Sequence, residues 1–291
     1  MKKMNLYLIS IASIFSLSGC SKKVVQTTGE RITNSYSFSE NLSSLEIKDI
    51  YLKLGNSSVL PEVNITFEGE RKVEITYEAS LEKEISIEKK ENTLLIKGQY
   101  YKEFISKGVI INITGFKFDE LDLQTCNCKI DNYSLSSSSN CSIDLSGASS
   151  LKIDSYNFLQ ELDLDLSGAS RVEANSLSIN KFDLDLSGAS KMEVKDINIS
   201  TFSSEISGAS IVVMNNGVVK ELDMDISGAS SFLCEKVNFD KAKVNISGAS
   251  KVNLAVTTSL NGSISGASTL IYTGEVDPNL SVSGGSIVTK K

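Results

Sequence analysis

Residues 161–190 read ELDLDLSGASRVEANSLSINKFDLDLSGAS and contain the block DLDLSGAS twice, beginning at Asp163 and again at Asp183. Before each Ser-Gly-Ala-Ser motif, apolar residues alternate with polar ones, as at Leu162 and Leu164. This period of two is typical of a strand with one buried face. The alternation resumes in the same phase at Val172, so the motif predicts a corner between two strands. A third short segment, Leu177 to Ile179, completes the repeat.

The motif recurs eight times, with Gly replacing Ala in the last copy, and the steps in sequence between successive motif glycines are 21, 20, 20, 20, 20, 18 and 18. Such a period predicts a stacked solenoid. Three short strands in each coil of about 20 residues indicate an all-β fold, a right-handed parallel β-helix. Glycine suits the corners because it tolerates unusual backbone angles and close packing of backbones. The predicted structural corner glycines are Gly147, Gly168, Gly188, Gly208, Gly228, Gly248, Gly266 and Gly284.

The N-terminus carries a second pattern. Basic residues precede an apolar stretch, Leu6 to Leu17, which ends in Leu-Ser-Gly-Cys at Cys20. This resembles a bacterial lipoprotein signal, and the apolar stretch is too short to cross a bilayer about 30 Å thick. We therefore expect a signal peptide over 1–19, lipidation of Cys20, and a lipid-anchored flexible tether over 20–35.

Residues 36–118 are predicted to form a β-rich N-terminal region that caps the repetitive β-helix of 119–291. A hairpin is expected from Val63 to Tyr77, turning at Gly69, and a second from Ile85 to Ile96. One regular repeat length back from Gly147 lies Asn127, which we expect to form the corner of a degenerate first coil.

Composition limits the chemistry. The formal charge is −7, and −9 once Lys2 and Lys3 leave with the signal, so no nucleic-acid partner is expected. The chain has no histidine, which excludes a Ser-His-Asp triad and leaves Cys126, Cys128 and Cys141 as an incomplete zinc set. Those three cysteines could be buried thiols, a disulfide or a metal site, whereas Cys234 occupies a predicted core position.

Carboxylates recur on the outward positions of the repeats. The predicted columns are Asp144, Asp165, Asp185, Glu205 and Asp225, with Asp163, Asp183 and Asp223 beside them. Clustered carboxylates suit hard cations, so the columns could bind calcium. They could equally be a solvated face that keeps the protein soluble. No cofactor is assigned, with calcium as the single candidate.

Three parts of the sequence together resemble the family described as putative auto-transporter adhesin, head GIN domain. They are the strand pattern from Val63 to Tyr77 followed by Asn92–Ile96, the segment Gly108–Thr114, and the serial Ser-Gly-Ala-Ser coils. The resemblance implies a β-helical envelope lipoprotein of Bacteroidetes-like bacteria, and it implies no catalytic or binding residues. The first coil departs from the family pattern at Cys126-Asn127-Cys128.

Three functions are compatible with these observations. The first is a non-enzymatic, adhesin-like interaction module, anchored in the cell envelope at the outer membrane and binding an unknown protein or glycan. The second is a passive structural spacer. The third is a polysaccharide-active enzyme using a carboxylate pair such as Asp163 and Asp165, although no insertion builds a cleft around that pair. Whether the protein faces the periplasm or the exterior is left open by the sequence.

Overall fold

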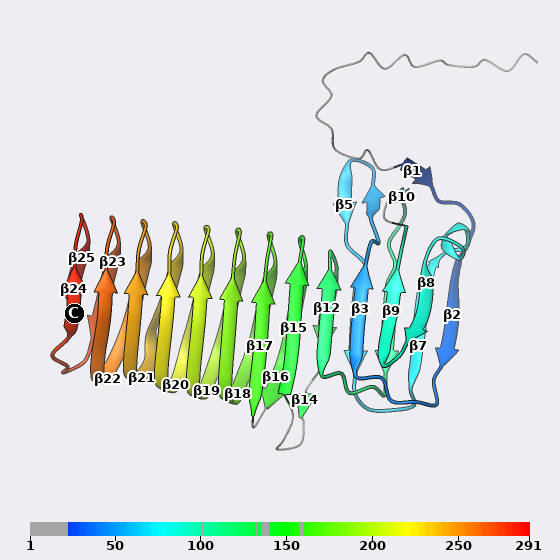
Figure 1. Ribbon diagram of the computed structural model, residues 1–291. Coiled ribbons are helices and arrows are strands. Elements are labelled where there is room, and N and C mark those ends of the chain that lie inside the picture. The colour runs from blue at the N-terminus through cyan, green and yellow to red at the C-terminus, as the bar shows by residue number, and fades with distance from the viewer. Residues whose placement is uncertain (1–22, 100–101, 132, 135–139, 158–159) are drawn as a thin grey trace, which may run out of the picture.

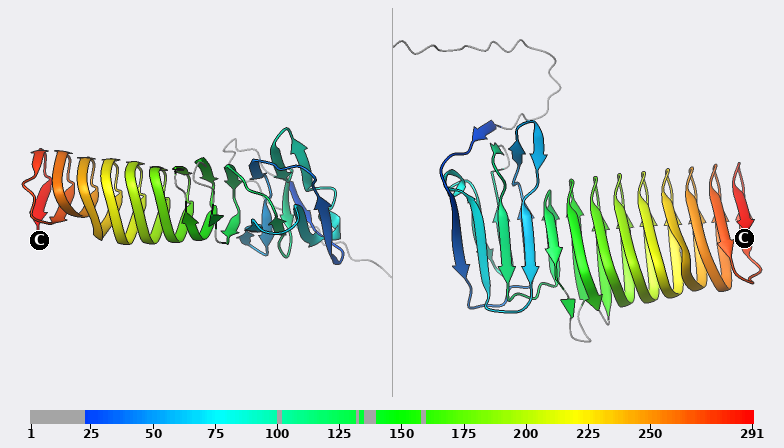
Figure 2. Two further views of the ribbon diagram at one scale, coloured as in Figure 1. Left: turned by 90° about the horizontal axis from the view of Figure 1, so that it is seen from below. Right: turned by 180° about the vertical axis from the view of Figure 1, so that it is seen from behind.

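The computed structural model describes residues 23–99, 102–131, 133–134, 140–157 and 160–291. The expected signal peptide and the lipidation site Cys20 lie outside these residues. In the described part of the chain, no helix has the length and apolar character needed to span a membrane. The strands form one long stack, with the N-terminal region at one end and the C-terminus at the other (Figures 1 and 2).

The Ser-Gly-Ala-Ser repeats form parallel coils, as the sequence predicts. Phe182 pairs with Phe202, and Asp185 with Glu205, each partner lying one repeat further along the chain. The fold is therefore a parallel β-solenoid of about 8 turns. Its strands are β12 (Glu120–Gln124), β13 (Asn127–Ile130), β14 (Tyr133–Ser134), β15 (Asn140–Ser146), β16 (Ser150–Asn157), β17 (Glu161–Leu166), β18 (Arg171–Leu186), β19 (Lys191–Ile206), β20 (Ile211–Ile226), β21 (Ser231–Ile246), β22 (Lys251–Ile264), β23 (Thr269–Thr273), β24 (Asn279–Val282) and β25 (Ile287–Lys290).

Each regular coil has three sides. In β18 the ladder to β19 skips Asn175 and Asn180, and both side chains are exposed. These bends divide the strand into the segments 171–174, 176–179 and 181–186, and the Ser-Gly-Ala-Ser corner closes the coil. The prediction of three short strands per coil is confirmed.

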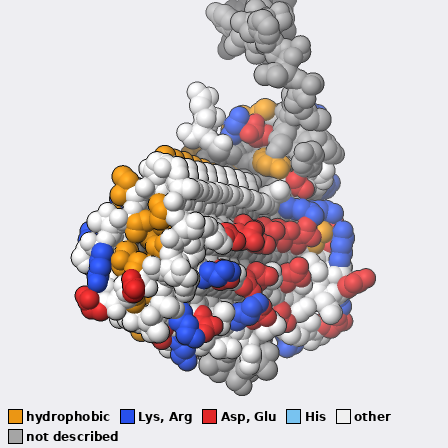
Figure 3. Space-filling view, turned by 60° about the vertical axis from the view of Figure 1, so that its left-hand side comes forward, with side chains coloured by type: hydrophobic (Ala, Val, Ile, Leu, Met, Phe, Trp, Pro, Cys, Tyr) orange, Lys and Arg blue, Asp and Glu red, His pale blue; other side chains and the backbone are white. Residues whose placement is uncertain are grey.

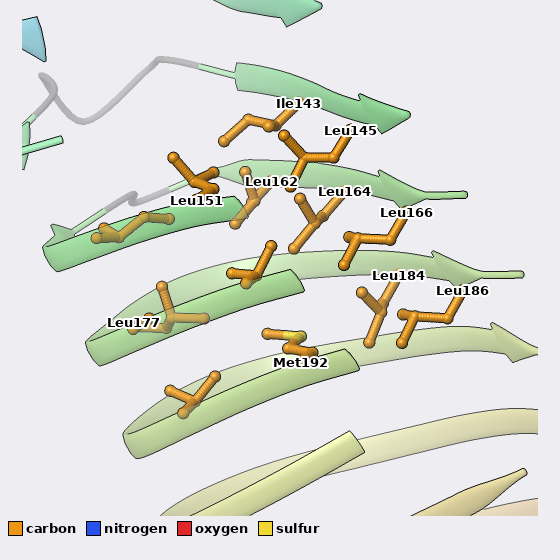
Figure 4. Packing of buried hydrophobic residues seen from close by; sticks show 14 of the residues in the cluster. Ile143, Leu145, Leu151, Leu162, Leu164, Leu166, Leu177, Leu184, Leu186 and Met192 are labelled. Atoms are coloured by element: carbon orange, nitrogen blue, oxygen red, sulfur yellow. The ribbon is translucent and has the colours of Figure 1, made fainter. Parts of the chain in front are cut away.

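Apolar side chains fill the interior in layers. Figure 4 shows Leu164 and Leu166 above Leu184 and Leu186, all pointing inward. Phe182 and Phe202 stack with their ring centroids 5.0 Å apart. Burying a side chain of this size contributes about 1.5–3 kcal/mol, so repetition of the pattern stabilises every coil through its neighbours.

The corner is held by backbone contacts and one hydroxyl. Gly208 has φ 74°, and the Ala209 amide donates to the Gly188 carbonyl at 2.8 Å. The last serine of each of the first seven motifs is buried, and in the Ser187–Ser190 corner its hydroxyl donates to the Ser187 carbonyl at 2.9 Å. All eight of the predicted corner glycines have positive φ.

The first coil differs from the prediction. Thr125, with φ 54°, takes the corner position, whereas Asn127 begins β13 opposite Ser150. Two residues separate the paired positions 124 and 127, but three separate their partners 146 and 150. The corner is one residue shorter here, so a constant repeat length pointed to the wrong residue.

The N-terminal region continues the stack instead of forming a separate layer. β3 pairs in parallel with β12, and β6 pairs in parallel with β13. A small second sheet has the order β1-β10-β4-β5. The elements of this region are β1 (Lys23–Gln26), β2 (Arg31–Ser37), β3 (Ser44–Lys48), β4 (Leu52–Leu54), β5 (Ser57–Val59), β6 (Glu62–Thr66), β7 (Lys72–Glu78), the 3-10 helix η1 (Ala79–Leu81), β8 (Ser86–Lys90), β9 (Thr93–Lys97), β10 (Lys102–Ile105) and β11 (Ile110–Thr114).

One predicted hairpin is confirmed and the other is wrong. β8 and β9 pair antiparallel around a two-residue turn. β6 and β7 do not pair with each other, because β11 lies between them, parallel to β6 and antiparallel to β7. The five-residue connection 67–71 can span two ladder spacings, about 9.6 Å, which leaves room for the inserted strand.

The flexible tether expected over 20–35 is also wrong where the structure describes it. β1 pairs in parallel with β10, and β2 pairs antiparallel with β7 along its whole length. Val25 and Ile32 pack against the core. Burial of these isolated apolar residues orders a segment whose composition is otherwise polar.

The corner geometry predicts a large penalty for a side chain at Gly208. A Cβ there would lie 2.3 Å from the Gly188 carbonyl oxygen, so Gly208→Ala must displace the backbone as well as hold a strained φ. Gly55→Ala is the matched control, because Gly55 has φ 62° and nothing within 4 Å of a new Cβ. In urea unfolding we expect Gly55→Ala to cost about 1–2 kcal/mol and Gly208→Ala clearly more. Equal losses would contradict close packing at the corner.

Candidate functional site

A line of carboxylates runs along one face of the solenoid. Alternate residues of the segment before each corner point outward, and the ladder joins Asp144 to Asp165 and Asp165 to Asp185. Glu205 and Asp225 follow in the same register. All five residues of the first predicted column therefore occupy consecutive coils.

The structure extends this column by two carboxylates that the sequence analysis missed. Glu46 pairs with Asp122, and Asp122 pairs with Asp144. Asp122 lies between Leu121 and Leu123 in the same alternation as the repeats, so that pattern could have revealed it. Glu46 comes from the N-terminal region, where no repeat indicates its register. We call the seven residues Glu46, Asp122, Asp144, Asp165, Asp185, Glu205 and Asp225 the acidic column.

The second predicted column is interrupted. Asp163 and Asp183 are neighbours, but Ser203 lies between Asp183 and Asp223. Lysine also neutralises part of it, since the Lys243 ammonium lies 2.9 Å from an Asp223 carboxylate oxygen. Lysine thus pairs with much of this line, whereas in the acidic column the ion pair formed within the described residues is that of Lys48 with Glu46, at one end.

A groove of about 610 Å³ follows the acidic column. One wall consists of its carboxylates from Asp144 to Asp225, continued by Asn245 and Ser263. The other wall consists of the first serines of the corners, Ser167, Ser187, Ser207, Ser227, Ser247 and Ser265. Figure 3 shows the carboxylates as a continuous red row beside the ridge of stacked corners.

The two serines of each motif have different roles. In the first seven motifs the last serine is buried in the corner, as a structural role requires. In the six motifs from Ser167 to Ser265 the first serine lines the groove. The hydroxyls of Ser207, Ser247 and Ser265 form long bonds of 3.4–3.5 Å to backbone carbonyls. These hydroxyls can exchange that bond for one to a ligand with little loss.

The acidic column carries its negative charge at an electrostatic cost. Burial raises the pKa of Asp165, and the neighbouring carboxylates raise it further. Burial likewise raises the pKa of Asp122, where Asp144 and Glu46 add to the effect. Charges one strand spacing apart, about 4.8 Å, repel by roughly 0.9 kcal/mol in water. A ligand that brings positive charge would relieve this repulsion.

The carboxylates of the acidic column are not arranged around a single point. Among the residues that the structure describes, no three Asp, Glu or Cys side chains are placed to bind one metal ion. Stacked carboxylates are spread along an axis about 4.8 Å per coil, whereas calcium needs six to eight oxygens at about 2.3–2.6 Å. The geometry therefore favours an elongated ligand over a discrete ion.

The cysteines are part of the interior. Cys126, Cys128 and Cys234 are buried free thiols, and Cys141 is buried as well. Cys126 occupies the slot of the last corner serine, and burial raises its pKa to about 12. Of the three interpretations open from the sequence, the structure matches buried thiols.

One buried carboxylate lies away from the groove. Glu78 accepts hydrogen bonds from the Ser106 hydroxyl and the Lys107 amide, both at 2.7 Å. Burial alone would raise the pKa of Glu78, but these bonds and the nearby Arg31 lower it overall. Both donors belong to the loop after β10, so Glu78 holds that loop in place.

Comparison with known proteins agrees with this architecture. Residues 155–275 match the family described as putative auto-transporter adhesin, head GIN domain, which confirms the resemblance drawn from the sequence. None of the curated proteins matches this sequence.

Solved structures share the fold over most of the chain. A putative adhesin from Parabacteroides merdae has 14% identity and a TM-score of 0.66, covering 92% of this chain and 99% of its own. A putative adhesin from Parabacteroides distasonis has 17% identity and a TM-score of 0.66, covering 92% and 100%. A putative lipid binding protein from the same organism has 15% identity and a TM-score of 0.63, covering 92% and 100%. At these identities the likeness shows the fold alone.

The raised pKa of Asp165 predicts how stability depends on pH. The native groove disfavours the ionised carboxylate, so Asp165→Asn should stabilise the protein at pH 7. The gain should shrink as pH falls through the native pKa and vanish below the ordinary value of 3.8, where wild-type Asp165 is protonated in both states. Urea unfolding midpoints across this range measure the effect.

Glu173→Gln is the control of opposite sign. Burial would raise the pKa of Glu173, but Arg171 and Lys152 lower it overall. This variant should therefore be destabilised at pH 7, with the difference lost only below the native pKa. The electrostatic description of the groove fails if both variants shift stability in the same direction.

Proposed function

We propose that this chain is a non-enzymatic, adhesin-like binding module of the cell envelope, anchored by lipid at Cys20, and that the groove beside the acidic column is its ligand-binding face. The observation that carries the proposal is the unbroken register from Glu46 to Asp225, which places seven carboxylates in line. Two of the similar structures are described as putative adhesins, in keeping with a binding role.

The groove favours a ligand that carries positive charge and groups able to form hydrogen bonds. Its negative wall attracts positive charge, and its serine wall offers hydroxyls that donate or accept hydrogen bonds. A lysine- or arginine-bearing protein segment, lying along the solenoid axis, would meet both walls over several coils. Spreading weak contacts over many repeats gives affinity without a deep pocket.

Catalysis is less well supported than binding. A glycosidase needs two carboxyl groups whose pKa values are set apart, so that one donates a proton while the other stays ionised. Burial raises the pKa of both Asp163 and Asp165, so their environments do not shift the two pKa values in opposite directions. Both residues also follow the repeat, and their positions resemble the equivalent positions of the neighbouring coils.

Binding should depend on the acidic column and not simply on net charge. The protein lacking the segment 1–20 should bind a short lysine-rich peptide, more weakly as ionic strength rises. The triple variant Asp165→Asn, Asp185→Asn, Glu205→Gln should bind at least about tenfold more weakly, a loss of about 1.4 kcal/mol. Calorimetric titration measures both.

The matched control neutralises three exposed carboxylates elsewhere, Glu62→Gln, Glu235→Gln and Glu275→Gln, and so has the same net charge. It should change affinity by no more than about twofold. Equal losses in the two triple variants would mean that the peptide binds by charge alone. No binding of the peptide or of any protein or glycan on an array would favour the passive spacer.

The lipid anchor has a separate test. Cells expressing the full chain with labelled fatty acid should yield a labelled, membrane-bound protein whose mass shows cleavage before Cys20. Cys20→Ala should lose the label, whereas Cys234→Ala, which alters a buried thiol, should keep it. Label retained in Cys20→Ala would show that this cysteine is not the site.

A further inference from the structure

The chain enters the folded body soon after the proposed lipid site. Lys23, the first residue of β1, follows Cys20 by three positions. Three residues span at most about 11 Å when they are fully extended. The headgroup layer on each side of a bilayer is about 5–8 Å thick. In a chain acylated at Cys20, the first strand therefore lies within the headgroup layer or just outside it.

β1 is firmly joined to the rest of the protein. Its four residues pair in parallel with β10, and the Thr27 hydroxyl donates to the Ile105 carbonyl at 2.6 Å. β10 pairs in turn with β4, and β4 pairs with β5. β2 then pairs with β7 along its whole length. An anchor at Cys20 would thus hold a folded sheet, β1-β10-β4-β5, at the membrane.

This small sheet carries uncovered apolar side chains. Val24 in β1 is 53% exposed, and Leu54 at the end of β4 is 59% exposed. Val24 points away from the core, because its neighbour Val25 is the residue that aligns with the buried Phe104. Isolated exposed apolar residues are common on protein surfaces. These two are informative because they belong to the sheet that follows the proposed anchor.

The charge of the small sheet suits a surface of lipid phosphates. Its four strands contain three lysines and one glutamate, although the chain as a whole has a formal charge of −7. The Lys53 ammonium lies 3.0 Å from a Glu103 carboxylate oxygen, and Lys102 forms an ion pair with Glu84. Lys23 is exposed. Basic and apolar side chains together favour binding at a membrane surface.

We propose that the small sheet β1-β10-β4-β5 docks on the membrane, with Val24 and Leu54 in the headgroup layer. The proposal rests on the anchor at Cys20, which is part of the proposed function. Figures 1 and 2 show this sheet projecting past the line of corners at the N-terminal end of the stack, so it can touch a flat surface ahead of the coils. None of its residues lines the groove, so docking and ligand binding use separate surfaces.

The short link makes weak surface contacts sufficient. Attachment at Cys20 turns docking into an intramolecular event, and a short linker raises the effective concentration of the two surfaces. Two apolar side chains and a few lysines would hold a free protein poorly, but they can orient one that is already attached. Docking would then present the groove at a fixed orientation to the membrane.

The sequence contains no tryptophan, which allows a direct test. The full chain with Val24→Trp is expressed with labelled fatty acid and reconstituted in phosphatidylcholine vesicles whose acyl chains are brominated. Bromine quenches tryptophan fluorescence on close approach. Interfacial side chains lie at the boundary of headgroups and acyl chains, so emission should fall at least about twofold relative to unbrominated vesicles. Leu54→Trp should respond in the same way and gives a second reporter if the first variant folds poorly.

Val218→Trp is the matched control. Val218 is also an exposed strand valine, at 42%, and it lies in β20 midway between two corners of the stack. Its emission should be the same in brominated and unbrominated vesicles. It should also stay accessible to the water-soluble quencher acrylamide, whereas Val24→Trp should become shielded.

Three outcomes in labelled, vesicle-bound protein would overturn docking and leave the anchor intact. The first is no quenching of Val24→Trp and Leu54→Trp by brominated lipid, and the second is equal quenching of Val218→Trp. The third is shielding of Val24→Trp from acrylamide without quenching by brominated lipid, which would mean that another protein covers the sheet. A chain without label at Cys20 would overturn the anchor and docking with it, so the two failures are distinguishable.

Discussion

Close approach of backbones at one corner is the constraint on which the stack depends. From Gly168 to Gly266, a Cβ on any corner glycine would lie 2.3–2.4 Å from the carbonyl oxygen of the previous corner. Only glycine permits that approach together with a positive φ. The corner therefore sets the coil spacing, and every ladder on the three sides follows from it.

A constant register has opposite consequences inside and outside. Inside, like residues stack on like, and Phe182 on Phe202 or Leu164 on Leu184 fills the core. Outside, the same register stacks carboxylate on carboxylate, which is electrostatically unfavourable. Packing of the inward side chains supplies the stability that offsets the repulsion within the acidic column. Binding of a cationic ligand would relieve that repulsion.

The ends of the stack are the places where the repeat stops providing partners. At the N-terminal end, β2, β7 and β8 turn antiparallel and carry charged side chains at the edge. At the C-terminal end, Val282 and Val288 continue the register of the buried Ile264 and Leu270.

The sequence by itself determined the parallel coils, the corner glycines and the acidic residues of the regular repeats, because a fixed period converts sequence spacing directly into spatial register. Tertiary structure alone decided where the period fails. It placed Thr125 instead of Asn127 at the first corner, inserted β11 between β6 and β7, and ordered Val25 and Ile32 in strands. It also brought Glu46 into the acidic column. Pairing between segments far apart in the chain depends on which strand edges and apolar faces are left uncovered. The local sequence pattern does not indicate which edges and faces those are.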